Sequence, residues 1–93
     1  MGKSCRERPK RLAEKLRHLR EGLGLSQNEM LARLGLSEKL SRTAISGYEL
    51  GTTEPSLLVL LKYARITGMR LEALIDDELD LPKRIHSQIH RSN

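Results

Sequence analysis

Hydrophobic residues recur along this chain at the three- and four-residue spacing of helices, in short runs that end at glycine. The first run places Leu12, Leu16 and Leu19 on one side, with charged residues elsewhere, and it ends at Gly22 and Gly24. We therefore predict an amphipathic first helix that begins after a natural boundary at residue 9, a proline.

Two further helical patterns in the middle of the chain are joined by a turn that contains glycine. Ser26, followed three residues later by Glu29, predicts a capping box at the start of the first pattern, and Gly35 ends it. The second pattern begins near Ser41, a residue type that caps helices, and stops at Gly51. A helix, a glycine turn and a second helix are the outline of a helix-turn-helix unit.

A leucine-rich fourth helix and a shorter fifth helix are predicted after this unit. Ser56 is placed to cap the fourth helix, which ends at Gly68. Its sequence leaves little polar face, so we expect it to lie at the centre of the core or to be covered by a partner. The fifth helix, over residues 70–79, is predicted to bury Leu71, Leu74 and Ile75.

The end of the chain carries a separate apolar stripe. Asp80 is a candidate helix cap and Pro82 falls in the first turn, while Leu81, Ile85 and Ile89 recur at a spacing of four. This pattern predicts a short sixth helix whose stripe packs either on its own domain or on a second subunit.

The composition limits the fold class. The 93 residues include no Phe, no Trp and two Tyr, so aliphatic residues must form the core, and the scarcity of β-branched runs predicts one all-α domain. No apolar stretch approaches the roughly 20 residues that cross a bilayer, and residues 1–11 lack the apolar segment of a signal peptide. The single cysteine, Cys5, cannot form an internal disulfide, which fits a cytoplasmic protein. A reactive thiol and a terminal bystander are both open interpretations of it.

The net charge of +5 is unevenly distributed. Residues 1–20 carry a net +6 and residues 83–93 carry +3, whereas residues 21–82 carry −4. The basic character therefore lies in the two ends, and the helix-turn-helix region is slightly acidic. Basic arms bind phosphate without selecting sequence, and a solvated terminus is the equally weighted alternative.

Three motifs in order resemble one family. They read L-S-Q-N-E-M-L-A-R-L-G, then A-I-S-G-Y-E-L-G, then E-P-S-L-L-V-L-L-K-Y-A. Together, from about Leu16 to Ile75, they resemble the DNA-binding domain of lambdoid phage repressors, Cro proteins and xenobiotic-response-element-type bacterial regulators. One departure is the nine residues between Gly35 and Ile45, where the family usually has about five. The resemblance implies a five-helix, lambda-repressor-like domain with an enlarged turn.

The resemblance also implies which residues bind DNA. Its second motif helix lies in the major groove, so Arg42, Thr43, Ser46 and Gly47 are the expected base-facing positions. Arg42 can pair with guanine, and Thr43 can meet a phosphate or a thymine methyl group. Gly47 cannot read a base and weakens the helix by about 1 kcal/mol relative to Ala, although it allows close approach to DNA.

Further positions follow from the same resemblance. Gln27 matches a phosphate-contacting glutamine at the start of the second helix. Thr52 and Thr53 occupy a loop where relatives carry Lys or Arg, and Lys39 in the enlarged turn is a candidate to compensate. A plain helical surface is the alternative for all of these residues. By the same register, the residues at 45 and 48 belong to the core.

A structural ion pair is also implied. Arg20 matches an arginine that pairs with the glutamate of the Y-E-x-G motif, here Glu49. Such a pair would tie the first helix to the recognition helix.

Metal binding and catalysis are disfavoured. Five acidic residues gather near the end of the chain, but a solvated helix face explains them better than a cation site. His86 and His90 share a metal-ligand spacing without a third ligand nearby, and His18 has no obvious partner at metal-ligand spacing. No nucleophile–base pair or glycine-rich phosphate loop is present, so we expect neither an enzyme nor a cofactor. The acidic residues are Glu72, Asp76, Asp77, Glu78 and Asp80.

The sequence thus predicts a basic arm (1–9), a helix-turn-helix domain (10–79) and a C-terminal helix and tail (80–93). The expected function is a transcriptional regulator, a repressor that binds a palindromic operator in double-stranded DNA as a homodimer. The interface is expected in the last family helix and the C-terminal stripe. Two alternatives stay open: an antitoxin whose C-terminal stripe binds a toxin, and a protein-interaction module that has lost DNA binding.

Overall fold

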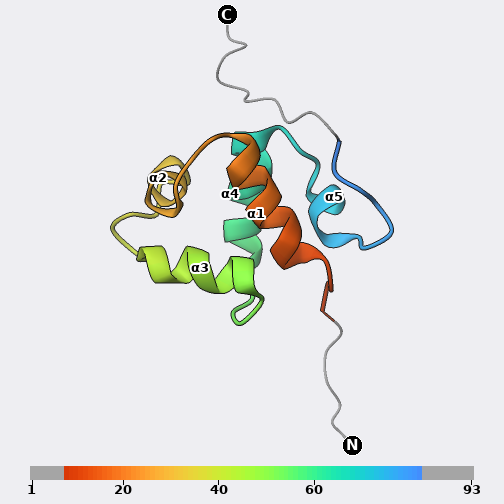
Figure 1. Ribbon diagram of the computed structural model, residues 1–93, viewed down its shortest axis with the longest axis horizontal. Helices are drawn as coiled ribbons and strands as arrows, with labels where there is room; N and C mark the ends of the chain where they lie inside the picture. Colours follow the sequence, from red (N-terminus) through yellow and green to blue (C-terminus); the bar gives the residue numbers. More distant parts are fainter. Residues whose placement is uncertain (1–7, 83–93) are drawn as a thin grey trace, which may run out of the picture.

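Five helices form the domain, as the sequence predicts. The computed structural model describes residues 8–82, and no strand occurs among them. The helices are α1 (Leu12–Gly22), α2 (Gln27–Arg33), α3 (Arg42–Leu50), α4 (Leu57–Thr67) and α5 (Leu71–Ile75). Helices α2 and α3 lie on one side of α1 and α4, and α5 lies on the other (Figure 1). In the same part of the chain, no helix is both long and apolar enough to cross a membrane.

Local capping explains where α2 and α4 begin. The Ser26 hydroxyl accepts a hydrogen bond from the Glu29 N–H at 3.0 Å, and the Glu29 carboxylate accepts one from the Ser26 N–H at 2.7 Å. This reciprocal arrangement confirms the capping box. Ser56 caps α4 through the N–H of Val59 at 3.2 Å. Ser41 precedes α3 without capping it, because its hydroxyl bonds to the Thr43 hydroxyl at 2.6 Å instead.

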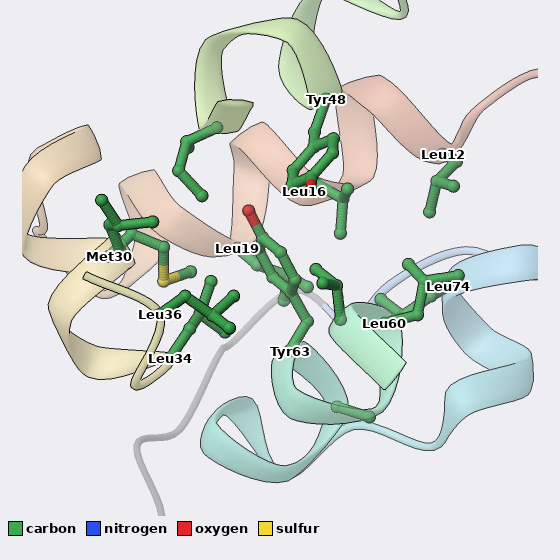
Figure 2. Close-up of a cluster of buried hydrophobic side chains, with 14 residues drawn as sticks. Leu12, Leu16, Leu19, Met30, Leu34, Leu36, Tyr48, Leu60, Tyr63 and Leu74 are labelled. Atoms are coloured by element: carbon green, nitrogen blue, oxygen red, sulfur yellow. The ribbon is translucent and has the colours of Figure 1, made fainter. Parts of the chain in front are cut away.

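The core is mostly aliphatic and receives side chains from all five helices (Figure 2). Leu16, Leu19, Ile45 and Tyr63 are completely buried there, and Tyr48 is nearly so. The Tyr63 hydroxyl has no hydrogen-bond partner within the described chain, and burial together with the nearby Glu49 carboxylate raises the pKa of this phenol. The two tyrosines thus belong to the core.

Helix α5 is less buried than the sequence predicts. Leu74 is completely buried, but Leu71 is half-buried and Ile75 is 37% exposed, so the prediction that Ile75 is buried is wrong. The helix ends at Ile75 after five residues, so this side chain lies in the last position of the helix, where it is exposed. At the start of α4, Leu57 and Leu58 are likewise exposed. The fourth helix is therefore covered on one face only.

The acidic segment after α5, residues 76–80, forms hydrogen bonds with the start of α1. The Asp77 carboxylate accepts hydrogen bonds from the N–H groups of Lys10 and Arg11 at 2.9 and 3.0 Å. In the opposite direction, the buried Lys15 ammonium donates to the carbonyls of Ala73 and Asp76 at 2.8 and 2.9 Å. The backbone N–H groups at the start of α1 and the carbonyls at the end of α5 thus receive side-chain partners, from Asp77 and Lys15 respectively.

The predicted C-terminal helix does not begin at Asp80. Residues 76–82 are not helical, and Asp80 forms an ion pair with Arg11 at 2.8 Å. Leu81 packs against the core of its own domain. The rest of the predicted sixth helix, with Ile85, Ile89 and both C-terminal histidines, lies outside the described residues. Within residues 8–82 no group of acidic, histidine or cysteine side chains could hold a metal ion.

The enlarged turn between α2 and α3 is held by its own backbone hydrogen bonds. After α2, Gly35 adopts a left-handed conformation with φ of 76°. The Leu36 carbonyl then accepts hydrogen bonds from the N–H groups of Lys39 and Leu40 at 3.0 and 2.9 Å. Leu36 is buried and Leu40 packs against the core, so the extra residues are anchored at both ends. The insertion therefore leaves α3 docked on the core, with its start at Arg42.

Candidate nucleic-acid interface

Helix α3 presents one polar face to solvent. Arg42 and Thr43 are exposed and Ser46 is half-buried, while Ile45 and Tyr48 are buried on the opposite face. Helical spacing brings the first three side chains to the same side. The structure therefore places three of the four predicted base-facing residues together on an accessible helix surface.

A buried ion pair fixes the rotation of α3 against α1. The Arg20 guanidinium donates from Nε to Glu49 Oε2 at 2.7 Å and from Nη2 to Glu49 Oε1 at 3.0 Å. Its third nitrogen, Nη1, donates to the Leu25 carbonyl at 2.8 Å. The exposed fractions of the two side chains are 15% for Arg20 and 4% for Glu49. The hydrogen bonds from the guanidinium to Glu49 raise the pKa of Arg20, so this cation stays protonated.

Gln27 joins this arrangement from the start of α2. Its side-chain amide nitrogen donates to Glu49 Oε1 at 3.2 Å, and the residue is half-buried. One of its two amide hydrogens is therefore donated to Glu49, which leaves the second for another acceptor. The three side chains link α1, α2 and the end of α3, so the α2 and α3 surfaces hold a fixed mutual orientation.

Gly47 is buried under its own loop rather than open to a ligand. The N–H groups of Thr52 and Thr53 both donate to the Gly47 carbonyl, at 3.0 and 3.2 Å. A β-carbon at position 47 would lie 2.9 Å from Thr53 Oγ1 and 3.2 Å from Thr53 Cβ. The glycine therefore allows the 52–53 loop to fold back on α3. The sequence analysis predicted that Gly47 allows close approach to DNA, because the contact with the 52–53 loop cannot be seen in the sequence.

The remaining predicted residues lie around this face. Thr52 and Thr53 are exposed beside the last turns of α3, and Lys39 is exposed in the enlarged turn before its first turn. The Thr43 hydroxyl is engaged with Ser41. Sequence reasoning missed Lys15, whose burial depends on the carbonyls at the end of α5, which no sequence signal near position 15 announces.

Comparison with known proteins gives one match. A family model described as helix-turn-helix, of the Cro/C1 type, matches residues 16–74. The matched span begins within α1, includes the Arg20–Glu49 pair and the whole of α3, and ends within α5. No curated protein and no solved structure matches the chain.

Proposed function

The chain belongs to the Cro/C1-type helix-turn-helix family, and from this premise we propose that it is a sequence-specific repressor that acts as a homodimer on a palindromic operator. The family itself suggests a DNA-binding transcriptional regulator. The observation that carries the proposal is the accessible polar face of α3, held in a fixed orientation by the buried Arg20–Glu49 pair. A rigid, exposed helix is what direct readout of the major groove requires.

The exposed face of α3 supplies chemically distinct contacts. The Arg42 guanidinium can donate two parallel hydrogen bonds to guanine, a contact worth roughly 1–3 kcal/mol of discrimination against a wrong base. The Thr43 hydroxyl is engaged with Ser41, and its methyl group is left for a thymine. When Ser41 is the donor of that bond, the Thr43 O–H can donate to a phosphate oxygen. Ser46 extends the polar face by one helical turn.

Contacts outside α3 would position the domain without selecting bases. The second amide hydrogen of Gln27 can bind a phosphate oxygen while the first is held by Glu49. Lys39, Thr52 and Thr53 flank the helix and are proposed to meet the backbone. Gly47 is proposed to act through the loop that it admits, which presents the two threonines beside the helix.

A homodimer follows from the small number of contacts that one domain offers. Two-fold symmetry would place two α3 helices about 34 Å apart, one turn of the duplex. Exposed apolar side chains at the end of α5 and beyond it, Ile75 and Leu79, support an interface there, continued by the C-terminal stripe. Residues 1–9 are proposed as a basic arm and residues 80–93 as a C-terminal helix and basic tail, although Leu81 near the start of that segment packs against the 10–79 domain. The protein is proposed to be cytoplasmic. Sedimentation that shows only monomer at tens of micromolar would contradict the dimer.

An antitoxin is the second candidate function. Leu57 and Leu58 at the start of α4 are 75% and 70% exposed, and they would suit a toxin as protein partner. In that case the protein should co-purify stoichiometrically with the product of a neighbouring gene. DNA binding without any such partner favours the repressor.

Selection of binding sites from random duplex DNA tests the proposed function. Wild type and Arg42→Ala are compared at two salt concentrations. We expect a palindromic consensus for the wild type and the loss of one specified base pair per half-site for the variant. Absence of any enrichment, even at low salt, would contradict DNA binding and favour the protein-interaction alternative.

A further inference from the structure

Leu50 is an exposed leucine at the end of the candidate recognition helix. Its exposed fraction is 72%, although the two residues before it are fixed inward: Tyr48 is in the core and Glu49 is paired with Arg20. Gly47, earlier in the same turn, is covered by the 52–53 loop. Leu50 is thus the single residue of this last turn that α3 directs to solvent.

The helical register places Leu50 on the proposed base-facing side. It follows Ser46 by four residues and Thr43 by seven, the spacing that keeps side chains on one face. That face is otherwise polar, and no core contact requires a leucine at its end, because Leu50 belongs neither to the buried core nor to the residues that pack against it. The apolar side chain is therefore a property of the outer face of α3.

We infer that Leu50 is a specificity-determining residue that contacts the C5-methyl group of a thymine. This inference rests on the proposed function and adds a base contact beyond Arg42, Thr43 and Ser46. The thymine methyl is the apolar group that base edges present in the major groove, so it is the feature there that an aliphatic side chain can recognise. Seven residues of helix advance about 10 Å, so the thymine lies within about three base pairs of the base that Thr43 faces.

Two other exposed leucines provide matched controls. Leu57 and Leu58 have nearly the same exposed fractions, 75% and 70%, but lie at the start of α4 rather than on the base-facing side of α3. Truncation at either position removes a similar amount of exposed apolar surface from the protein. A change in DNA binding that is seen only on truncation of Leu50 therefore results from its position on the base-facing side of α3.

The test replaces each thymine of the selected site by uracil, which removes only the methyl group. Binding of these duplexes is measured for wild type, Leu50→Ala and Leu57→Ala, and circular dichroism checks that each variant is folded. For wild type, uracil at one position per half-site should weaken half-site binding about fourfold, the equivalent of burying one methyl group. Leu50→Ala should bind the thymine site more weakly and lose the uracil effect at that one position, whereas Leu57→Ala should retain it. A thymine that the Thr43 methyl group contacts would give a second uracil effect, which Leu50→Ala should keep.

Three results would overturn the inference. Every uracil effect seen with the wild type could persist in Leu50→Ala, or no uracil position could affect the wild type. Leu50→Ala could instead weaken binding to all sequences equally and reduce self-association, which would place Leu50 in an interface between copies. Each of these leaves the proposed function intact if the wild type still binds its site specifically. Failure of the wild type to bind any DNA would overturn the proposed function and this inference together.

Discussion

Removing Glu49 should destabilise the domain more than removing the whole ion pair. In Glu49→Ala the Arg20 guanidinium, with a side chain only 15% exposed, loses two hydrogen bonds and the compensating charge. One hydrogen bond to the Leu25 carbonyl remains, and it cannot neutralise the cation. Breaking a buried pair in this way typically costs 3–5 kcal/mol, so we expect a loss of about 3 kcal/mol for this partly accessible one.

This loss is large for a small domain. A chain of this size has a free energy of unfolding of about 5–14 kcal/mol, so Glu49→Ala would remove a substantial part of it. Urea unfolding followed by helical circular dichroism measures the effect directly. With a slope of about 1–1.5 kcal/mol per molar urea, the midpoint should fall by about 2–3 M. If little native protein remains without urea, the same comparison can be made with Glu49→Gln, which keeps the shape and one acceptor.

The double variant Arg20→Met/Glu49→Leu separates the pair from its parts. It removes both charges and fills the site with apolar side chains, so it should cost less than Glu49→Ala alone. A double-mutant cycle then gives the coupling between the two positions. An unfolding curve of Glu49→Ala that overlies the wild type, or a double variant whose loss equals the sum of the single losses, would refute this account of α3 docking.

Two further predictions concern the loop over α3 and the start of α1. Gly47→Ala should lower stability by about 1 kcal/mol in a thermal melt, because displacement of Thr53 outweighs the improved helix propensity; a stabilised variant would contradict this. The N–H groups of Lys10 and the next residue lower the pKa of Asp77, so its contribution to stability is present above the unfolded-state pKa and is lost as pH falls through the lowered one. The melting temperature of Asp77→Asn should therefore lie below that of the wild type at neutral pH and approach it in acid. The control Glu72→Gln should show no such pH-dependent loss. A difference between Asp77→Asn and the wild type that does not change with pH would contradict the argument.

Local sequence signals predicted the elements of this fold well. The capping box at Ser26, the cap at Ser56 and the glycine that ends α3 act through neighbouring residues, so the chain itself displays them. The inward register of Ile45 and Tyr48 also follows from helical spacing alone. These features are short-range, which is why a single sequence suffices to predict them.

Contacts between distant segments were beyond the sequence. Asp77 caps a helix that begins 65 residues earlier in the chain, and Lys15 donates to carbonyls at the end of α5. The burial of Gly47 depends on the path of a loop, and the exposure of Ile75 depends on how early α5 ends. Hydrophobic periodicity shows which side of a helix is apolar, but it does not show how much of that side a neighbour covers.

The site was predictable to a different degree. The family resemblance located the recognition helix and paired Arg20 with Glu49, two residues that the structure brings together. It also directed attention to Gly47 and away from Leu50, because the motif gives the position of each residue without its exposure. The residues that can face a base are those whose side chains the core does not bury, and their exposure is known only once the packing of the core is known.

The central claim is that the exposed face of α3 reads a DNA sequence, and one competition measurement tests it most directly. A labelled duplex carrying the selected palindrome is titrated with wild type, in the presence of either the same unlabelled duplex or one with its base order scrambled, across a series of salt concentrations. We predict binding to the palindrome at least about 10³-fold tighter than to the scrambled duplex at physiological salt, with two protomers per site. Equal competition by the two duplexes at every salt concentration would contradict the account.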